Sequence, residues 1–307
     1  YPGGCAIGLR PIDIHLNGIK SFGGKIVEKN GYIYADGQNL KAGDFMLPFA
    51  SVGATENLMM LACLIDGESR IFNPAKEPEI VDLQSFLNKA GADISGAGTN
   101  MIVVRGKQRL FGCEFTPISD RIEAGTFMVA TAMCGGKVSL KGANGKDNLC
   151  LIEKLKKSGC EIEVSDDGVV VTQKSRPKSF GEIETAVYPG FPTDMQPQMM
   201  ALACISDGYS LICENLFESR FKHASELIKM GGDIKLKNGI CVVRGKEKLY
   251  GADVVSTDLR GGVSLVLAGL KSEGYTTVDK IELIDRGYFK LEDKITLLGG
   301  EIKRKLD

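Results

Sequence analysis

Apolar and polar positions along the chain repeat in a pattern that predicts helices alternating with short strands. Five segments share the form apolar–Gly–small–x–Ile: FGGKI, AGADI, SGCEI, MGGDI and LGGEI. A glycine directly after the last apolar turn is typical of a helix end. Because these segments return every 68 to 72 residues, we predict a chain of repeated units. Their first glycines are Gly23, Gly91, Gly159, Gly231 and Gly299.

A second glycine precedes each of the last four and is followed by a β-rich run. Between the two glycines, apolar residues lie three and four apart, as in IVDLQSFLNKAG and ASELIKMGG, which predicts a helix. Runs such as NMIVVRG, GVVVTQ and GICVVRG then predict strands. Each unit should therefore read helix, strand, helix, strand, strand. The second glycines are Gly67, Gly136, Gly208 and Gly274.

The first helix of each unit is rich in Ala, Gly and Met and poor in charge. Examples are ATENLMMLACLI, GTFMVATAMC, DMQPQMMALACI and GGVSLVLAGL. A helix that is apolar on most sides must be covered on most sides. We therefore predict an α/β protein in which several units form each domain, with helices inside and sheets outside.

Length and charge narrow the class of protein. A chain of 307 residues is long for one core, which favours two domains. A formal net charge of −1 argues against nucleic acid as a partner, because a surface that follows phosphates is usually basic. No apolar run reaches the ~18 residues that span a bilayer, so no membrane partner is expected.

The cysteines and histidines do not form a pattern typical of disulfides or metal sites. Nine cysteines, without a CxxC pair, fit a reducing cytoplasm. Most lie in apolar runs such as MMLACLI and MALACIS and are expected to be buried, whereas Cys5 lies in the glycine turn PGGCAIG. His15 and His223 are too few for a metal cluster and are expected on helix surfaces.

Five arginines lie at or near predicted helix N-termini, where the helix dipole disfavours a cation by roughly 0.3–1 kcal/mol. Each could pair with a nearby cap carboxylate: Asp13, Asp120, Glu218, Asp258 or Asp285. A bound anion at the same helix N-terminus would also offset the unfavourable interaction between the helix dipole and the arginine. For the set, we predict an anionic ligand with more than one charged group. The arginines are Arg10, which precedes Pro11 at a predicted N1 position, Arg121, Arg220, Arg260 and Arg286.

The segment FPTDMQPQMM opens one of the buried helices with a polar pair. Thr193 or Asp194 could serve as the N-cap of this helix. The stiff turn YPGFP before it suggests instead that the Asp194 carboxylate is aimed at a ligand. Both interpretations remain open from the sequence.

Several motifs together carry a resemblance to a known family. PGGCAIGLRPIDIHL, FASVGAT, EPEIVD, DRIEAGTF, PGFPTDMQ, TDLRGGVSLVLAGL and IDRGYFKLEDK appear in order over essentially the whole chain. In these motifs the chain resembles the UDP-N-acetylglucosamine 1-carboxyvinyltransferases, a family of enolpyruvyl transferases. The sister family of 5-enolpyruvylshikimate-3-phosphate synthases shares the repeat fold but lacks the cysteine loop.

The resemblance implies two domains, each an inside-out α/β barrel. Residues 1–118 would hold the remainder of the first domain with the cysteine loop, and residues 119–307 the second. The family moves the enolpyruvyl group of phosphoenolpyruvate to the 3′-hydroxyl of UDP-N-acetylglucosamine and releases phosphate. This is the first committed step of peptidoglycan synthesis, hence of cell wall biogenesis, cell shape and division. It needs no metal or organic cofactor.

The resemblance also implies roles for individual residues. Cys5 would be the general acid toward the methylene carbon of phosphoenolpyruvate and the group that fosfomycin alkylates, and Asp194 would accept the proton of the sugar hydroxyl. The Ser51–Val52 turn would contact the uridine nucleotide, and Leu216 would lie in the loop under the sugar. Arg10, Arg220, Arg260 and Arg286 would surround the phosphate and carboxylate of phosphoenolpyruvate, with Asp258 beside the reacting carbon. Nucleotide contacts would also come from Arg10, Pro11, Ile12, Asp13 and Ile14.

The chain departs from the family pattern at its front. The family's Lys-Asn pair and the arginine before the cysteine loop do not occur in these residues, and the unit ending near Gly37 lacks its first half. From this we expect a chain shortened by about a hundred residues and nearly inactive alone. Two alternatives remain: a non-catalytic homologue that binds a UDP-sugar, and a shikimate-pathway transferase.

Overall fold

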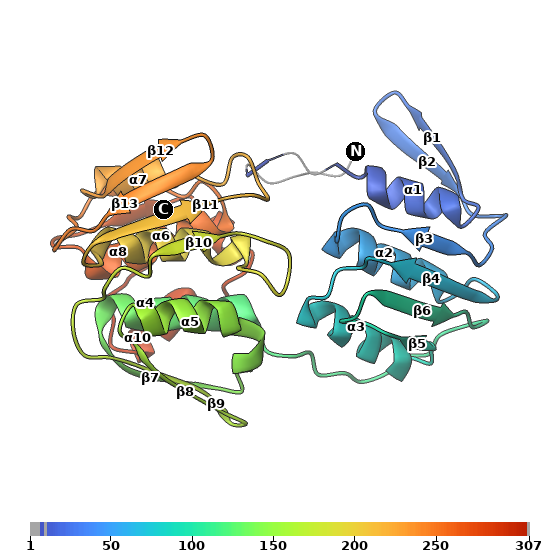
Figure 1. The fold of residues 1–307 in the computed structure, drawn as a ribbon, viewed down its shortest axis with the longest axis horizontal. Helices are drawn as coiled ribbons and strands as arrows, with labels where there is room; N and C mark the ends of the chain where they lie inside the picture. Colours follow the sequence, from blue (N-terminus) through green and yellow to red (C-terminus); the bar gives the residue numbers. More distant parts are fainter. Residues whose placement is uncertain (1–6, 9–10, 306–307) are drawn as a thin grey trace. The chain divides into compact units, whose positions relative to one another are not determined.

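Two compact units make up the molecule, which is seen here as a computed structural model that describes residues 7–8 and 11–305. Of the described residues, the first unit contains 11–118 and 187–189 and the second contains 7–8, 119–186 and 190–305, and each is described by itself (Figure 1). Cys5 and Arg10, two of the predicted site residues, lie outside the described residues. Ile7 is buried in the second unit, where its carbonyl accepts a hydrogen bond from the Ser219 N–H at 3.0 Å.

The first unit contains one hairpin and one mixed four-stranded sheet. Strands β1 and β2 pair antiparallel, and the sheet has the order β3-β4-β6-β5. The helices pack on this sheet around a core of buried aliphatic side chains. The elements are α1 (Asp13–Ser21), β1 (Lys25–Lys29), β2 (Tyr32–Asp36), β3 (Asp44–Met46), α2 (Val52–Ala62), β4 (Glu68–Phe72), α3 (Pro78–Lys89), β5 (Ile94–Ser95) and β6 (Met101–Arg105).

The second unit contains three sheets, with strand orders β7-β9-β8, β10-β11-β13-β12 and β14-β15. Its first half comprises α4 (Arg121–Cys134), β7 (Gly136–Lys141), η1 (Gly145–Asn148), α5 (Leu149–Lys157), β8 (Glu161–Ser165), β9 (Gly168–Gln173) and β10 (Glu182–Glu184). Next come η2 (Thr193–Met195), α6 (Gln196–Ile205), β11 (Tyr209–Cys213), α7 (Ala224–Lys229), β12 (Asp233–Lys237) and β13 (Ile240–Arg244). The last are β14 (Asp253–Val255), α8 (Leu259–Lys271), β15 (Thr277–Asp279), α9 (Glu282–Asp285) and α10 (Leu291–Leu297).

The predicted repeat of helix, strand, helix, strand, strand is confirmed. It occurs as α2-β4-α3-β5-β6, as α4-β7-α5-β8-β9 and as α6-β11-α7-β12-β13. The five repeat glycines end their helices with φ between 88° and 103°, a backbone region that side chains rarely adopt. These glycines recur at a regular spacing because each repeat has a left-handed backbone at this helix end, which favours glycine.

Three short strands were not predicted. The strands β3, β10 and β14 each lie directly before the first helix of a repeat. Each pairs in parallel with the strand that follows that helix. In β10, for example, Glu182 pairs with Leu211 of β11. Each strand has only three residues, too few to show a period in the sequence. A strand, a helix and a parallel strand thus form a βαβ crossover.

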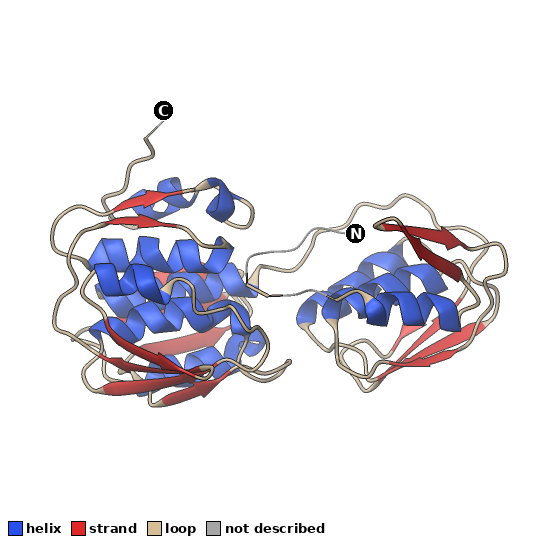
Figure 2. Cartoon of the chain, turned by 90° about the horizontal axis from the view of Figure 1, so that it is seen from above, coloured by secondary structure: helices blue, strands red, loops and turns tan. Residues whose placement is uncertain are grey.

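The prediction that the first helices lie inside is confirmed for the second unit. All ten residues of α6 are buried, and α6 packs against both α4 and α8. Figure 2 shows the helices of this unit gathered between strands on either side. In the first unit it holds only in part, because Met60 and Leu64 near the end of α2 are 49% and 58% exposed. Among the described helices of that unit, α2 has only α1 and α3 to cover it.

Of the eight cysteines that the structure describes, four are buried, as expected of small hydrophobes, and three are only partly buried. Cys63 and Cys204 are fully buried, as expected. Cys134 is exposed, contrary to that expectation, because it ends α4 next to Gly135. Burial raises the pKa of Cys63 to about 11, so this thiol stays protonated at neutral pH.

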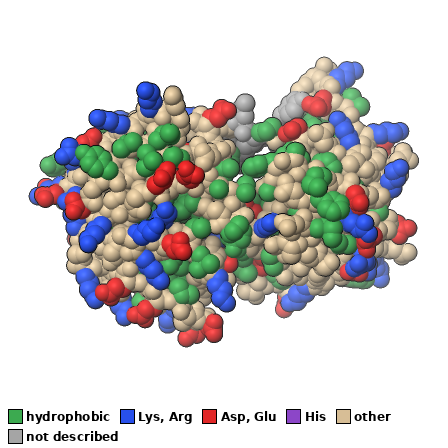
Figure 3. Space-filling view, viewed as in Figure 1, with side chains coloured by type: hydrophobic (Ala, Val, Ile, Leu, Met, Phe, Trp, Pro, Cys, Tyr) green, Lys and Arg blue, Asp and Glu red, His purple; other side chains and the backbone are tan. Residues whose placement is uncertain are grey.

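On the face that Figure 3 shows, charged side chains of both signs are interspersed. This distribution accords with a net charge of −1. Within residues 7–8 and 11–305, no helix has the length and apolar character needed to cross a membrane.

Two glycines at equivalent repeat positions lie against a neighbouring carbonyl. A Cβ atom on Gly106 would lie 1.7 Å from the carbonyl oxygen of Ile65, and one on Gly245 would lie 1.6 Å from that of Ser206. We expect Gly106→Ala to lower the free energy of unfolding by about 1–3 kcal/mol, since the backbone must move apart. Urea unfolding measures this loss.

A matched control exists in the same unit. A Cβ atom on Gly112 would meet nothing within 4 Å, and its backbone is not in the left-handed region. Gly112→Ala should therefore leave the unfolding midpoint nearly unchanged. Equal midpoints for the two variants would contradict the close approach at Gly106.

Candidate functional site

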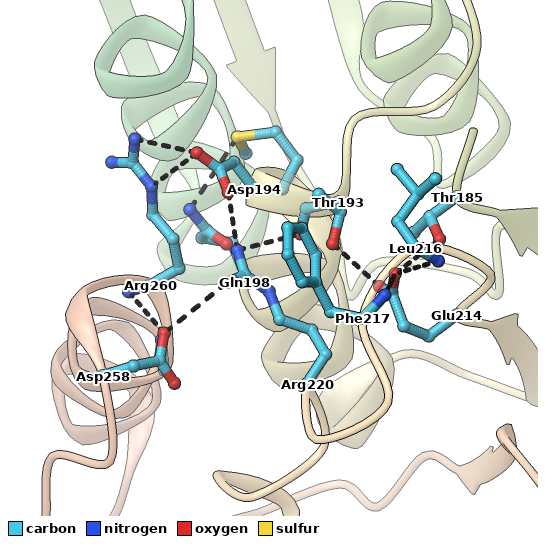
Figure 4. A network of polar contacts seen from close by, with 12 residues as sticks. Thr185, Thr193, Asp194, Gln198, Glu214, Leu216, Phe217, Arg220, Asp258 and Arg260 are labelled. Atoms are coloured by element: carbon cyan, nitrogen blue, oxygen red, sulfur yellow. Dashed lines mark hydrogen bonds and ion pairs between the residues drawn. The ribbon is translucent and has the colours of Figure 1, made fainter. Parts of the chain in front are cut away.

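The most distinctive polar group of the second unit is a carboxylate held by two arginines (Figure 4). Asp194 lies in η2, the single 3₁₀ turn before α6. Its Oδ1 accepts a hydrogen bond from Nη2 of Arg220 at 2.7 Å, and its Oδ2 accepts from Nη2 and Nε of Arg260 at 3.2 and 3.3 Å. The Asp194 side chain is still 41% exposed, so a ligand can reach it.

Arg220 and Asp258 are the most deeply buried charges of the group. The Arg220 side chain is 2% exposed and lies in the loop between β11 and α7. Besides Asp194, Nη2 donates to the carbonyl oxygen of Thr193 at 3.2 Å, and Nη1 lies 3.8 Å from Oδ1 of Asp258. Because two carboxylates face one guanidinium, its charge is compensated although it is removed from water.

Asp258 has a second function as the N-cap of α8. Its Oδ1 accepts hydrogen bonds from the N–H groups of Arg260 and Gly261 at 3.0 and 3.1 Å, and its Oδ2 accepts from the Thr257 hydroxyl at 3.1 Å. The carboxylate satisfies free donors of the first helical turn and fixes where α8 begins. Arg260, two residues on, is thereby held at a defined place.

Arg260 lies over an aromatic ring on its other side. Its Cζ is 5.3 Å from the ring centre of Tyr288, which is fully buried. The Tyr288 hydroxyl lies 2.8 Å from Oγ1 of Thr126 on α4, which also accepts from Nε2 of Gln198 at 3.1 Å. Helices α4, α6 and α8 therefore all contribute to the support of Arg260.

The pKa of the Asp194 carboxyl follows from these neighbours. Burial acts to raise the pKa, but the charges and hydrogen bonds of Arg260 and Arg220 outweigh it and lower the pKa below its usual value. Asp194 is therefore ionised at neutral pH. The arrangement is an anionic group, reachable by ligands, between two cationic donors that suit phosphate or carboxylate.

Several local expectations are corrected. Asp194 does not cap α6, whose first turn has no side-chain cap. Arg220 and Arg260 meet at Asp194 and do not each pair with a nearby cap carboxylate. Asp285 instead binds Arg304 through two hydrogen bonds of 2.8 and 2.9 Å.

Arg286 is not at a helix N-terminus as predicted. It follows Asp285 at the C-terminal end of α9. Its side chain is exposed, and within the described ranges it makes no hydrogen bond or ion pair. It remains available to an anionic ligand.

His223 was expected on a helix surface, and this was wrong, because its side chain is fully buried. Neither ring nitrogen has a hydrogen-bond partner among residues 7–8 and 11–305, although the nearby Arg220 carbonyl favours protonation. Burial lowers the pKa of His223 to about 4, an effect that Asp258 opposes and the Arg220 charge increases. His223 is therefore neutral at pH 7.

The buried His223 should make the second unit sensitive to acid. Between pH 6.5 and about 4 the unfolded chain binds a proton at His223 and the folded chain does not, so stability is full above this range and falls as the pH drops through it. The expected loss is on the order of 3 kcal/mol in the free energy of unfolding. Urea titrations across this pH range measure it.

Substitution of His223 separates this effect from other acid effects. His223→Gln should flatten the slope between pH 4 and 6.5, whereas His15→Gln should change it less, because His15 is only half-buried. An unchanged slope in His223→Gln would contradict the assignment.

The predicted nucleotide contacts of the first unit lie at the starts of two neighbouring helices. Ser51 caps α2, its hydroxyl accepting from the Ala54 N–H at 3.4 Å. The α1 residue His15 lies 3.1 Å from Asn57 of α2 through Nδ1 and Nδ2, and a Cβ atom on Gly53, in the first turn of α2, would lie 3.4 Å from Cε1 of His15. The N-terminal ends of both helices therefore lie together, and their free N–H groups favour an anion.

The start of α1 differs from the prediction. Ile12 is its N-cap and Asp13 its first residue, so Pro11 precedes the helix and is not its N1 residue. Ile14 lies in the first turn and packs on the core of this unit, half-buried. Val52 opens α2 and also packs on that core.

Sequence reasoning missed Glu214, which lies between the predicted residues Asp194 and Leu216. Its carboxylate accepts hydrogen bonds from the Leu216 N–H at 2.9 Å and from the hydroxyl of Thr193 at 2.9 Å. An acidic residue directly after a strand gives no signal of such a role. Tyr288 was also missed, since a buried tyrosine has no distinctive spacing.

Two further features lie outside this group. Glu182, Glu184 and Cys213 come close enough to hold a metal ion, but they are partly or fully exposed and no second feature points to an ion. An open cavity of about 330 Å³ is lined by none of the predicted site residues. Its lining comprises Cys150, Glu153, Lys154, Glu182, Glu184 and Phe191.

Comparison with known sequences identifies relatives over almost the whole chain. Residues 1–295 match the family of EPSP synthase (3-phosphoshikimate 1-carboxyvinyltransferase). UDP-N-acetylglucosamine 1-carboxyvinyltransferase 2 of Caldanaerobacter subterraneus subsp. tengcongensis is 48% identical over 304 residues, covering 99% of this chain and 73% of that protein. UDP-N-acetylglucosamine 1-carboxyvinyltransferase 1 of Symbiobacterium thermophilum is 50% identical over 305 residues, covering 99% and 69%.

Solved structures share the fold. The enolpyruvyl transferase NikO from Streptomyces tendae matches with a TM-score of 0.87 at 24% identity, over 96% of this chain and 72% of that one. EPSP synthase from Acinetobacter baumannii matches with a TM-score of 0.70 at 21% identity, over 96% and 72%. The predicted fold of repeated helix-strand-helix-strand-strand units is thus confirmed as that of the enolpyruvyl transferases.

Proposed function

The chain belongs to the UDP-N-acetylglucosamine 1-carboxyvinyltransferases within the EPSP synthase family, and we propose that Asp194, Arg220 and Arg260 form the core of its active site. The reaction transfers the enolpyruvyl group of phosphoenolpyruvate to the 3′-hydroxyl of UDP-N-acetylglucosamine and releases phosphate. One observation carries the assignment of residues: a carboxylate that is 41% exposed lies between arginines that are 2% and 12% exposed.

Asp194 accepts the proton of the attacking sugar hydroxyl. Before substrate binds, the two arginines lower the pKa of Asp194 and make it a weak base. Phosphoenolpyruvate brings a phosphate and a carboxylate, which attract the same guanidinium groups. Their negative charge offsets the pull of the arginines and raises the pKa of Asp194. Substrate binding and activation of the base are thereby coupled.

The chemistry balances in two steps. In the addition, the hydroxyl oxygen bonds to C2 of phosphoenolpyruvate, its proton passes to Asp194, and C3 gains a proton. In the elimination, the bond from C2 to the phosphate oxygen breaks and C3 returns a proton to the group that supplied it, which forms the enol ether, while the proton held by Asp194 leaves with the phosphate. Arg220, Arg260 and the exposed Arg286 compensate the charge of the leaving phosphate. The resemblance assigns the acid toward C3 to Cys5, outside the described residues.

The first unit supplies the nucleotide contacts. The starts of α1 and α2 lie together and present free backbone N–H groups, which favour the diphosphate of a UDP-sugar. The residues assigned to this role are Pro11, Ile12, Asp13, Ile14, Ser51 and Val52, and Leu216 of the second unit is assigned to the sugar loop.

We place the reaction at the first committed step of peptidoglycan synthesis, and therefore in cell wall biogenesis, cell shape and division. Thiols such as Cys63 and Cys160 are buried with their pKa raised to about 11, which fits a cytoplasmic protein that keeps its cysteines reduced. The family resemblance assigns alkylation by fosfomycin to Cys5.

A phosphate-release assay tests the proposed function. Phosphate should appear only when phosphoenolpyruvate and UDP-N-acetylglucosamine are both present, and one fosfomycin adduct, seen in the intact mass, should block it. Release with shikimate 3-phosphate in place of the UDP-sugar would instead support the sister activity. Binding of the UDP-sugar without any release would support the non-catalytic alternative.

A further inference from the structure

The carboxylate of Glu214 accepts four hydrogen bonds, although it belongs to neither a helix nor a strand. Its Oε1 accepts from the Thr185 hydroxyl at 2.8 Å and from the N–H groups of Leu216 and Phe217 at 2.9 and 3.1 Å. Its Oε2 accepts from the Thr193 hydroxyl at 2.9 Å. A carboxylate offers about four lone-pair positions, so the capacity of Glu214 is nearly filled.

These bonds join three separate segments of the second unit (Figure 4). Thr185 directly follows β10, and Thr193 opens η2. The residues Leu216 and Phe217 form the loop after β11 that leads to Arg220. The first segment is also tied directly to this loop, since the Asn215 N–H donates to Oγ1 of Thr185 at 2.9 Å.

The hydrogen bond between Thr193 and Glu214 lies one residue away from Asp194. Asp194 is the next residue of the same 3₁₀ turn, which has no side-chain cap of its own. Arg220 binds this turn from the other side, because its Nη2 donates to both the Thr193 carbonyl and the Asp194 carboxylate. The turn that carries Asp194 is therefore fixed between Glu214 and Arg220.

A carboxylate suits this place better than a neutral side chain. It can only accept, so both threonine hydroxyls and both amides must point toward it, and hydrogen bonds to a charged acceptor are the stronger kind. Loops of this kind otherwise move more than the elements they connect.

We propose that Glu214 is a positioning residue for the transferase reaction, acting through Thr193 on the orientation of Asp194 and through the Leu216 amide on the loop beside the sugar nucleotide. The inference rests on the proposed function of Asp194. Glu214 itself touches no substrate in this role.

A pair of threonine variants tests the proposal. Thr193→Val and Thr185→Val each delete one hydroxyl bond to the same carboxylate, at 2.9 and 2.8 Å. Thr185→Val also removes the acceptor of the Asn215 N–H, but only the Thr193 bond adjoins Asp194. Thr193→Val should lower kcat about 10- to 100-fold, because a misplaced catalytic group loses up to about that much. It should leave KM for UDP-N-acetylglucosamine nearly unchanged. Thr185→Val should leave kcat within about threefold. Equal effects of the two on kcat would overturn the proposal.

A double-mutant cycle separates positioning from general support. If Glu214 acts through Asp194, Glu214→Ala lowers kcat strongly in the wild-type protein but hardly at all when Asp194→Asn is already present. It raises KM for the UDP-sugar in both backgrounds, through the Leu216 loop. If the double variant instead loses kcat by the product of the two single losses, Glu214 has a structural role that is independent of Asp194. Glu184→Ala is the matched control, since Glu184 is an exposed glutamate at the end of β10, directly before Thr185.

A measurement without turnover distinguishes failure of this inference from failure of the proposed function. Carbon-13 NMR titration of Asp194 should find its pKa raised toward the ordinary value in Thr193→Val and unchanged in Thr185→Val, because only the first loosens its contact with the arginines. Wild-type protein that releases no phosphate would end the proposed function. An unchanged Asp194 titration in Thr193→Val would end the positioning role.

Discussion

Replacing Asp194 with asparagine is expected to lower kcat by about 10²–10⁴-fold, the usual contribution of a general base. Asparagine keeps the shape of the side chain but cannot take up the hydroxyl proton. It also leaves Arg220 and Arg260 without their shared anion. KM for phosphoenolpyruvate should therefore stay level or fall, since the guanidinium groups no longer have a competing carboxylate. Initial rates of phosphate release with each substrate varied give both values.

The control for this variant is Asp207→Asn. Asp207 is exposed in the same unit and follows the C-terminal end of α6, whereas Asp194 precedes the N-terminal end of this helix. Its substitution should leave kcat unchanged. If Asp194→Asn keeps kcat within a few-fold of the wild type, Asp194 is not the proton acceptor, and the paired arginines serve only to bind anions.

Replacing Arg220 with methionine is expected to lower the free energy of unfolding by about 3–5 kcal/mol, as when one partner of a buried ion pair is removed. Methionine fills much of the same volume, so the loss reports charge more than packing. Asp258, which is 2% exposed, then keeps its charge without a facing cation. Urea unfolding, followed by a signal specific to the second unit, measures the loss.

An exposed ion pair in the same unit supplies the comparison. Lys174 and Glu161 approach to 2.8 Å while 71% and 64% exposed. Lys174→Met should cost no more than about 1 kcal/mol, because water already screens this pair. If both variants lose the same small amount, the Arg220 charge is not important for stability.

The repeat could be predicted from the sequence because it rests on local chemistry. A helix that ends in a left-handed backbone needs glycine, so Gly91 or Gly231 marks a helix end without knowledge of distant residues. The buried helices were predictable for the same reason, since α6 carries no charged residue at all. The strands β3, β10 and β14 could not be predicted, because only pairing with a later strand makes them strands.

Family resemblance identified the residues of the candidate site, but the contacts between these residues could not be predicted from the sequence. Asp194 and Arg220 are 26 residues apart, and Arg260 is 66 residues from Asp194. No pattern of hydrophobic positions reports which cation meets which anion over such separations. The local alternative, a cap carboxylate beside each arginine, was reasonable and incorrect for Arg220 and Arg260. The prediction that His223 lies on a helix surface failed for a related reason, because the burial of a single polar residue does not change the periodic pattern of hydrophobic positions.

The short parallel strands have a consequence for how the chain folds. β3, β10 and β14 each meet their partner strand after a single intervening helix, so each of these parallel pairs is completed within one repeat. Pairing across such a crossover must close a long loop and is slower than helix formation, but translation, at about 5–20 residues per second, is slower still. A ribosome releasing this chain from its N-terminal end could therefore let each βαβ crossover form before the next repeat emerges, which limits the time that apolar helices such as α6 spend uncovered.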